Sequence, residues 1–128
     1  MVKRFDVNSV RSSGGRYSHV GEVGPGGRLF HLAGQTGTAP DGTTPEGIEA
    51  QSRVVYQNIA SVLKECGMGL ENLVKLTIYH TDPDNIEAWR NVQKEALGNI
   101  APASTLLVVS RLARPEYLIE VEAIAAID

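Results

Sequence analysis

The clearest pattern in the chain is a strict alternation of apolar and other side chains over residues 117–126, which predicts a β-strand. Side chains of a strand point alternately to its two faces. One face then carries Ile119, Val121, Ala123, Ala125 and Ile127, an apolar set that suits packing under helices. The other carries Leu118, Glu120, Glu122, Ile124 and Ala126. A freely solvated face rarely holds so many apolar residues, so we expect a subunit interface to cover it in part.

Apolar residues recur at helical spacing in two segments, residues 44–67 and 82–98, and predict two amphipathic helices. Thr44 suits the N-cap of the first helix, and Gly67 suits a left-handed residue after its end. Pro83 suits the first position of the second helix. Each helix has one apolar stripe, so each is expected to cover a sheet.

Shorter apolar runs predict four more strands, at residues 17–23, 28–33, 73–80 and 105–112. The breaker cluster at 24–27, Gly-Pro-Gly-Gly, predicts a hairpin turn between the first two. The run at 73–80 is apolar enough to favour a strand buried on both faces.

These elements follow one another as β-β-α-β-α-β-β within a single domain, residues 1–128. Helices with one apolar stripe each, placed beside a sheet, predict a two-layer α+β fold. Two helices can cover only one face of such a sheet. The other face must be polar or must meet another subunit.

Glu120 and Glu122 stand two positions apart on the half-apolar face of the last strand. They could be structural and accept hydrogen bonds from the backbone or from arginine. They could also act as a general acid and base, because apolar neighbours disfavour the charged form of a carboxylate.

Composition excludes several classes of function. The formal net charge is -3, with no run of basic residues longer than Lys3-Arg4, so no nucleic-acid surface is expected. Residues 1–6 have no apolar core typical of a signal peptide, and no apolar stretch is long enough to span a bilayer. A single cysteine, Cys66, fits a reducing compartment, so we expect a cytoplasmic protein without a membrane partner.

The histidines do not form a metal motif. His19, His31 and His80 fall on three different segments, and no Glu-x-x-His or His-x-His pair is present. We therefore expect no metal site and no cofactor.

An ordered set of short motifs resembles the RidA/YjgF family across essentially the whole chain. The motifs are Ala33-Gly34-Gln35, Gln57-Asn58-Ile59, Asn91, Pro102-Ala103 and the ending at residues 119–125. The resemblance implies a chorismate-mutase-like fold and a homotrimer whose sheets form a barrel, with clefts between subunits. It also implies hydrolysis of reactive enamines and imines without a metal or cofactor.

The same resemblance implies which residues line the cleft. Glu120 corresponds to the glutamate that places or activates water. Tyr17, Gly34 and Asn91 correspond to ligand-binding positions of the family. Ser104 stands where the family has a carboxylate-binding arginine, and a serine cannot supply that charge.

Arg16, next to Tyr17, is the candidate replacement for the absent arginine. It can reach the cleft only if residues 14–17 form a loop, which Gly14-Gly15 favours. Two interpretations follow: a hydrolase of enamines or imines with an altered substrate, and a non-catalytic trimer that binds a small molecule or a partner. A third interpretation, a role on RNA, is weakened by the acidic charge.

Overall fold

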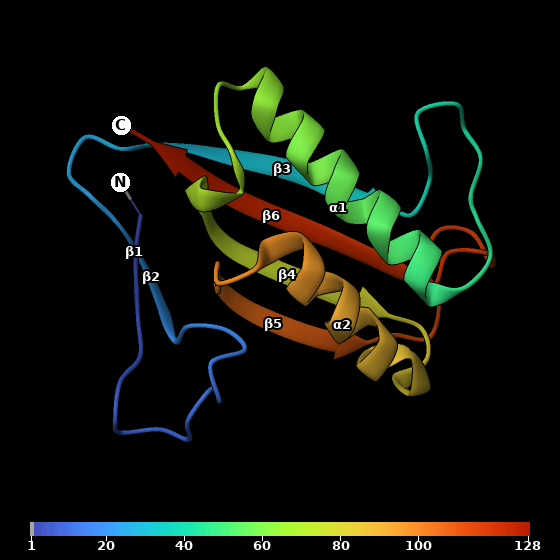
Figure 1. The fold of residues 1–128 in the computed structure, drawn as a ribbon, viewed down its shortest axis with the longest axis horizontal. Coiled ribbons are helices and arrows are strands. Elements are labelled where there is room, and N and C mark those ends of the chain that lie inside the picture. The colour runs from blue at the N-terminus through green and yellow to red at the C-terminus, as the bar shows by residue number, and fades with distance from the viewer. Residues whose placement is uncertain (1) are drawn as a thin grey trace.

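The protein folds into a layer of two helices against one face of a four-stranded sheet, with a two-stranded ribbon at one end (Figure 1). This computed structural model describes residues 2–128, so Met1 of the predicted domain lies outside the described residues. The helices are α1 (Ile48–Glu65) and α2 (Ile86–Leu97). The strands are β1 (Val2–Phe5), β2 (Val20–Val23), β3 (Arg28–Thr36), β4 (Leu73–His80), β5 (Ala103–Val108) and β6 (Ile119–Ile127).

The main sheet has the order β3-β6-β4-β5. Strand β6 is antiparallel to both of its neighbours, whereas β4 and β5 are parallel. The sheet is therefore mixed, and the predicted α+β class with two helices on one face is confirmed.

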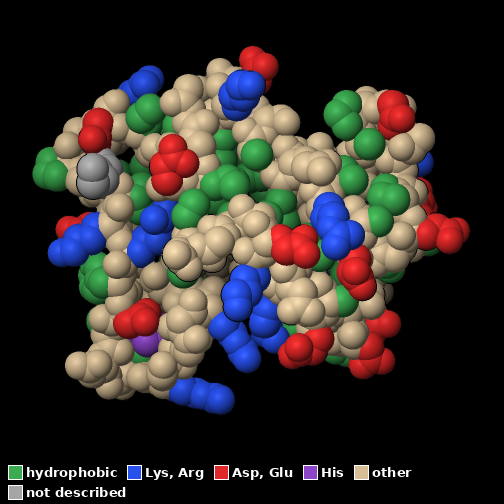
Figure 2. All heavy atoms as spheres, in the orientation of Figure 1, with side chains coloured by type: hydrophobic (Ala, Val, Ile, Leu, Met, Phe, Trp, Pro, Cys, Tyr) green, Lys and Arg blue, Asp and Glu red, His purple; other side chains and the backbone are tan. Residues whose placement is uncertain are grey.

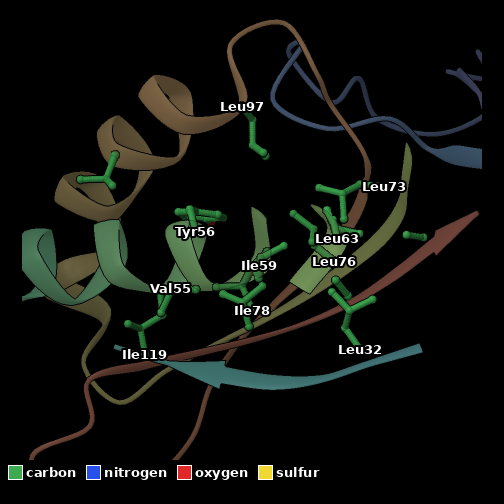
Figure 3. Packing of buried hydrophobic residues seen from close by; sticks show 14 of the residues in the cluster. Leu32, Val55, Tyr56, Ile59, Leu63, Leu73, Leu76, Ile78, Leu97 and Ile119 are labelled. Atoms are coloured by element: carbon green, nitrogen blue, oxygen red, sulfur yellow. The ribbon is translucent and has the colours of Figure 1, made fainter. Parts of the chain in front are cut away.

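The core lies between the sheet and the helices, as predicted from the alternation in the last strand. Figure 3 shows side chains of α1, among them Val55, Ile59 and Leu63, directed at the sheet. Ile119 and Val121 of β6 are fully buried beneath them. Burial of apolar area of this kind is the main stabilising contribution to such a domain.

Both helix ends fall where predicted, but the helix starts differ. Gly67 has φ 75°, and the Met68 amide donates to the Leu63 carbonyl, which closes a Schellman motif. The predicted cap at Thr44 is wrong: α1 begins at Ile48, and the Thr44 hydroxyl contacts Thr38 instead.

The second helix begins later than predicted because its first turn is tighter than an α-helix. Pro83–Asn85 form a 3-10 turn, in which the Asp82 side chain accepts a hydrogen bond from the Asp84 amide. The α-helix proper starts at Ile86.

The predicted hairpin across residues 24–27 is wrong. These residues do form a turn, in which the Gly27 amide donates to the Gly24 carbonyl. However, β2 pairs with β1 and β3 pairs with β6, so the turn joins two different sheets. Strand β1 was not predicted, because its four residues are too short for a pattern to show.

The sheet face opposite the helices is open. Of β4, only Leu73, Leu76, Ile78 and His80 are buried, so the prediction of a strand buried on both faces is wrong for the single chain. Its other face carries Lys75, Thr77 and Tyr79, which are half-buried. No helix among residues 2–128 is both long and apolar enough to cross a membrane.

Candidate functional site

A groove of about 820 Å³ opens between the N-terminal loop, α2 and the start of β5. Four residues expected at a ligand site line it: Arg16, Tyr17, Asn91 and Ser104. Figure 2 shows basic side chains gathered where the surface is hollowed beside α2. A volume of this size suits a small metabolite.

The loop that forms one wall of the groove is shaped by two glycines. Gly14 and Gly15 have φ of 66° and 78°, a region that other residues rarely adopt. Their amides donate to the hydroxyls of Ser12 and Ser13 at 3.1 and 3.2 Å. Residues 14–17 are thus a loop, as the placement of Arg16 requires, and Arg16 is exposed on it.

Ser18 fastens this loop to the sheet. Its hydroxyl donates to the Ala101 carbonyl at 2.7 Å, and its amide donates to the Pro102 carbonyl at 3.4 Å. These bonds hold the preceding Tyr17, which is half-buried and lies edge-on to His19, beside the first residues of β5.

Ser104 lies on the helix side of the sheet, at the level of Leu76 in β4. Its hydroxyl donates to the Pro102 carbonyl at 3.0 Å, so the side chain is tied to its own strand. Asn91 faces the same groove from the exposed side of α2. The groove therefore combines neutral polar groups from β5 and α2 with basic groups from the loop and α2.

Gly34 and Glu120 form a second cluster on the open face of the sheet. The register between β3 and β6 shifts between Leu32 and Gln35, which takes the Gly34 backbone out of regular pairing. A Cβ atom placed on Gly34 would meet Glu120 Oε2 at 2.1 Å. The Glu120 carboxylate thus lies directly against the Gly34 backbone.

Tyr79 joins this cluster, and the sequence analysis missed it. It lies opposite Glu120 across the β4–β6 pairing, and its hydroxyl donates to Glu122 Oε1 at 2.8 Å. That hydrogen bond, together with the nearby charges of Glu122 and Glu120, raises the pKa of Tyr79. The alternation of Lys75, Thr77 and Tyr79 along β4 could have assigned Tyr79 to the open face, but its place beside the carboxylates depends on the register between β4 and β6.

The two clusters stay apart within one chain. Ser104 is level with Leu76, whereas Glu120 is level with Tyr79, three residues further along β4. They also stand on strands separated by β4 and face opposite sides of the sheet. The backbone separation is about 10 Å along the strands and about 10 Å across them.

Among residues 2–128, no three His, Cys, Asp or Glu side chains lie together as metal ligands would. Cys66 is a free, half-buried thiol at the end of α1 and lies in neither cluster.

Comparison with known families matches residues 9–127 to a family described as Endoribonuclease L-PSP. The chain belongs to the RidA/YjgF family. It is 35% identical over 128 residues to the mitochondrial protein mmf2 of Schizosaccharomyces pombe, covering 98% of this chain and 99% of that protein. It is also 36% identical to a RutC family protein of Pyrococcus abyssi, over 87% of this chain and 86% of the relative.

Solved structures of this family share the fold. The Rid family protein YyfB of Yersinia pestis, described as of unknown function, superposes with a TM-score of 0.87 at 28% identity over 98% of both chains.

A mouse protein named 2-iminobutanoate/2-iminopropanoate deaminase is 27% identical, over 87% of this chain and 81% of its own length. The expected cytoplasmic location stays a prediction, since mmf2 is named as mitochondrial.

Proposed function

We propose that this RidA/YjgF protein is a homotrimeric hydrolase of reactive enamines or imines, with its sites in clefts between subunits and an altered substrate. The observation that carries the proposal is the Glu120 carboxylate seated against the irregular Gly34 backbone. The deaminase name of the mouse relative supports the reaction class.

The separation of the two clusters supports a cleft shared by two chains. Each chain carries Glu120 and Gly34 on the open face of its sheet. The groove with Tyr17, Asn91 and Ser104 lies on the other side of the sheet, beside α2. In a cyclic trimer, one subunit can present the first cluster to the groove of the next. The half-buried polar face of β4 and the exposed Leu107 of β5 are suited to such a contact.

The chemistry assigned to Glu120 is proton transfer. The carboxylate accepts a proton from water as the water oxygen bonds to the C=N carbon. The carboxylate passes this proton to the nitrogen, which gives a tetrahedral carbon that bears a hydroxyl and an amino group. The hydroxyl proton then moves through the carboxylate to the amino group as the C–N bond breaks, so ammonia and a carbonyl compound leave. The Gly34 backbone would contact the polarised group, while Tyr17 and Asn91 would orient the rest of the substrate.

Substrate choice is expected to differ from that of family members with an arginine at the Ser104 position. Losing a charged partner for a carboxylate costs roughly 2–5 kcal/mol when the acid stays unpaired. The exposed loop position of Arg16 allows it to supply that charge from the other side of the groove.

Ammonia release from a panel of imines, with and without a carboxylate, tests the proposal. The wild-type protein should release ammonia from at least one imine faster than the buffer does. Glu120→Gln keeps the shape but removes the base, so it should lower turnover by about 100-fold or more while the trimer persists. Equal rates for the two proteins would remove Glu120 from the mechanism.

A non-catalytic trimer that binds a small molecule is the second candidate, favoured by the uncharged Ser104 in the groove. It would show ligand binding in the groove and ammonia release no faster than in buffer across the whole panel.

A further inference from the structure

The groove carries an excess of positive charge on an acidic protein. Its lining includes Arg11, Arg16, Arg90 and Lys94, and none of the described residues that line it is Asp or Glu. The chain as a whole has a formal net charge of -3, so this concentration of cations is local. A concave surface lined by one sign of charge raises the local concentration of the opposite ion.

Three of these cations have no side-chain partner among the residues that the structure describes. The side chains of Arg11, Arg16 and Lys94 make no hydrogen bond or ion pair with residues 2–128. Arg90 alone is engaged, by Glu87 at 3.2 Å and by the Trp89 ring.

Most arginines outside the groove have side-chain partners among residues 2–128. Arg4 donates to the carbonyls of Glu71 and Leu73, and Arg53 pairs with Glu49 and Glu95. Arg114 lies outside the groove and also has no side-chain partner among the described residues, so the groove is distinguished by the gathering of three such cations on one concave surface.

We infer that the groove binds a small acid that carries a second, phosphoryl group in addition to its carboxylate. This inference rests on the proposed function, because it names the substrate class of the same cleft. A carboxylate and a phosphoryl group together carry about three negative charges, which the three unpaired cations Arg11, Arg16 and Lys94 can balance. A volume of about 820 Å³ leaves room for such a molecule.

Arginine suits this role because its fork binds phosphate oxygens through two hydrogen bonds. Arg11 approaches from the loop and Lys94 approaches from α2, so the phosphoryl group would be held from two sides, while Arg16 would bind the carboxylate. The remaining cation, Arg90, stays paired with Glu87.

An RNA chain fits the surroundings less well than a small phosphorylated acid. Glu87 and Glu95 are exposed on α2 and would repel phosphates that continue beyond the groove. The groove is also sized for one small molecule rather than a polymer.

Calorimetric titration of the trimer with glycolate, malonate and phosphoglycolate at about 0.1 M ionic strength tests the inference. Phosphoglycolate should bind at least about tenfold more tightly than the other two. Arg16→Gln and Lys94→Gln should each weaken it about tenfold. Lys64→Gln removes a charge from the exposed end of α1, outside the groove, and should leave binding unchanged.

Equal affinity for all three acids would overturn the inference. So would a loss of phosphoglycolate affinity in Lys64→Gln as large as the loss in the Arg16 and Lys94 variants. Malonate binding as tightly as phosphoglycolate would contradict the phosphoryl assignment. A short RNA that displaces phosphoglycolate and loses affinity in the Arg16 and Lys94 variants would instead assign the groove to RNA.

Failure of the hydrolase proposal can be told apart from failure of this inference. Glu120→Gln removes a negative charge and should bind phosphoglycolate at least as tightly as the wild type. Intact binding without any ammonia release would retain the phosphorylated ligand and reject the hydrolysis.

Discussion

Gly34 is the residue whose lack of a side chain matters most at the proposed site. A methyl group there would overlap Glu120 Oε2, at 2.1 Å, so the carboxylate would have to move. We expect Gly34→Ala to lower turnover by about 100-fold, because small displacements of a catalytic group are costly. The unfolding midpoint should change little, since the displaced atoms are the end of a flexible side chain.

Enzyme kinetics and thermal unfolding of Gly34→Ala, beside Glu120→Gln, make this measurement. Wild-type turnover in Gly34→Ala would show that the contact between Gly34 and Glu120 has no role in catalysis.

His80 is a second residue with an unusual setting. It is fully buried, both ring nitrogens are without a hydrogen-bond partner among the described residues, and the Trp89 ring lies edge-on to it. Burial lowers the pKa of His80 to about 4. The unfolded chain, with an ordinary histidine pKa near 6.5, then binds more protons than the folded chain between these two values.

Protonation of His80 in the unfolded chain therefore does not affect the free energy of unfolding above about pH 6.5. Below that pH it lowers this free energy, by about 1.4 kcal/mol per pH unit as the pH drops towards 4. His80→Leu should abolish this slope between pH 6.5 and pH 5. Urea unfolding at matched protein concentration measures the free energy of unfolding at each pH. His31→Gln removes an exposed histidine and serves as the control. A slope that persists in His80→Leu would assign the pH dependence to other groups.

At the scale of elements, the open face of the sheet is the feature that needs explanation. Leu107 of β5 lies level with Tyr79 on this face and is 44% exposed. An uncovered leucine on the same face as the half-buried Tyr79 and Glu120 is typical of a surface that another subunit covers.

Leu107→Asp should therefore lower the molecular mass below that of a trimer, because a buried, unpaired carboxylate would oppose association. Light scattering at micromolar concentration measures it. Val10→Asp adds the same charge at a more exposed apolar residue of the N-terminal loop, 56% exposed, and should leave the trimer intact. A wild-type monomer would contradict the trimer itself.

Much of this arrangement could be predicted from the sequence. The alternation in β6 assigned Ile119 and Val121 to the core and Glu120 to the open face, because a strand has a fixed two-residue period. The hairpin failed because a turn motif defines local backbone shape and not which strands pair. The partner of Glu122, Tyr79, depended on register between distant segments, which no local pattern fixes.

At the scale of the whole molecule, the predicted site residues divide into two clusters within one chain. Arg16, Tyr17, Asn91 and Ser104 line the groove, and Gly34 and Glu120 meet on the open face. The sequence alone does not show which subunit of an assembly supplies each side chain to a cleft. That division became visible only when the strand order placed β4 between the two clusters.

The shared cleft can be tested by mixing two variants that are each inactive. Glu120→Gln damages one cluster, and Ser104→Trp fills the groove that forms the other. If each cleft takes one cluster from each of two neighbouring subunits, equal amounts unfolded and refolded together should restore about a quarter of the wild-type clefts. Ammonia release by the mixture should then approach about a quarter of the wild-type rate, whereas each variant refolded alone stays inactive. A mixture as inactive as its parts, with trimer mass confirmed, would contradict a site built from two chains.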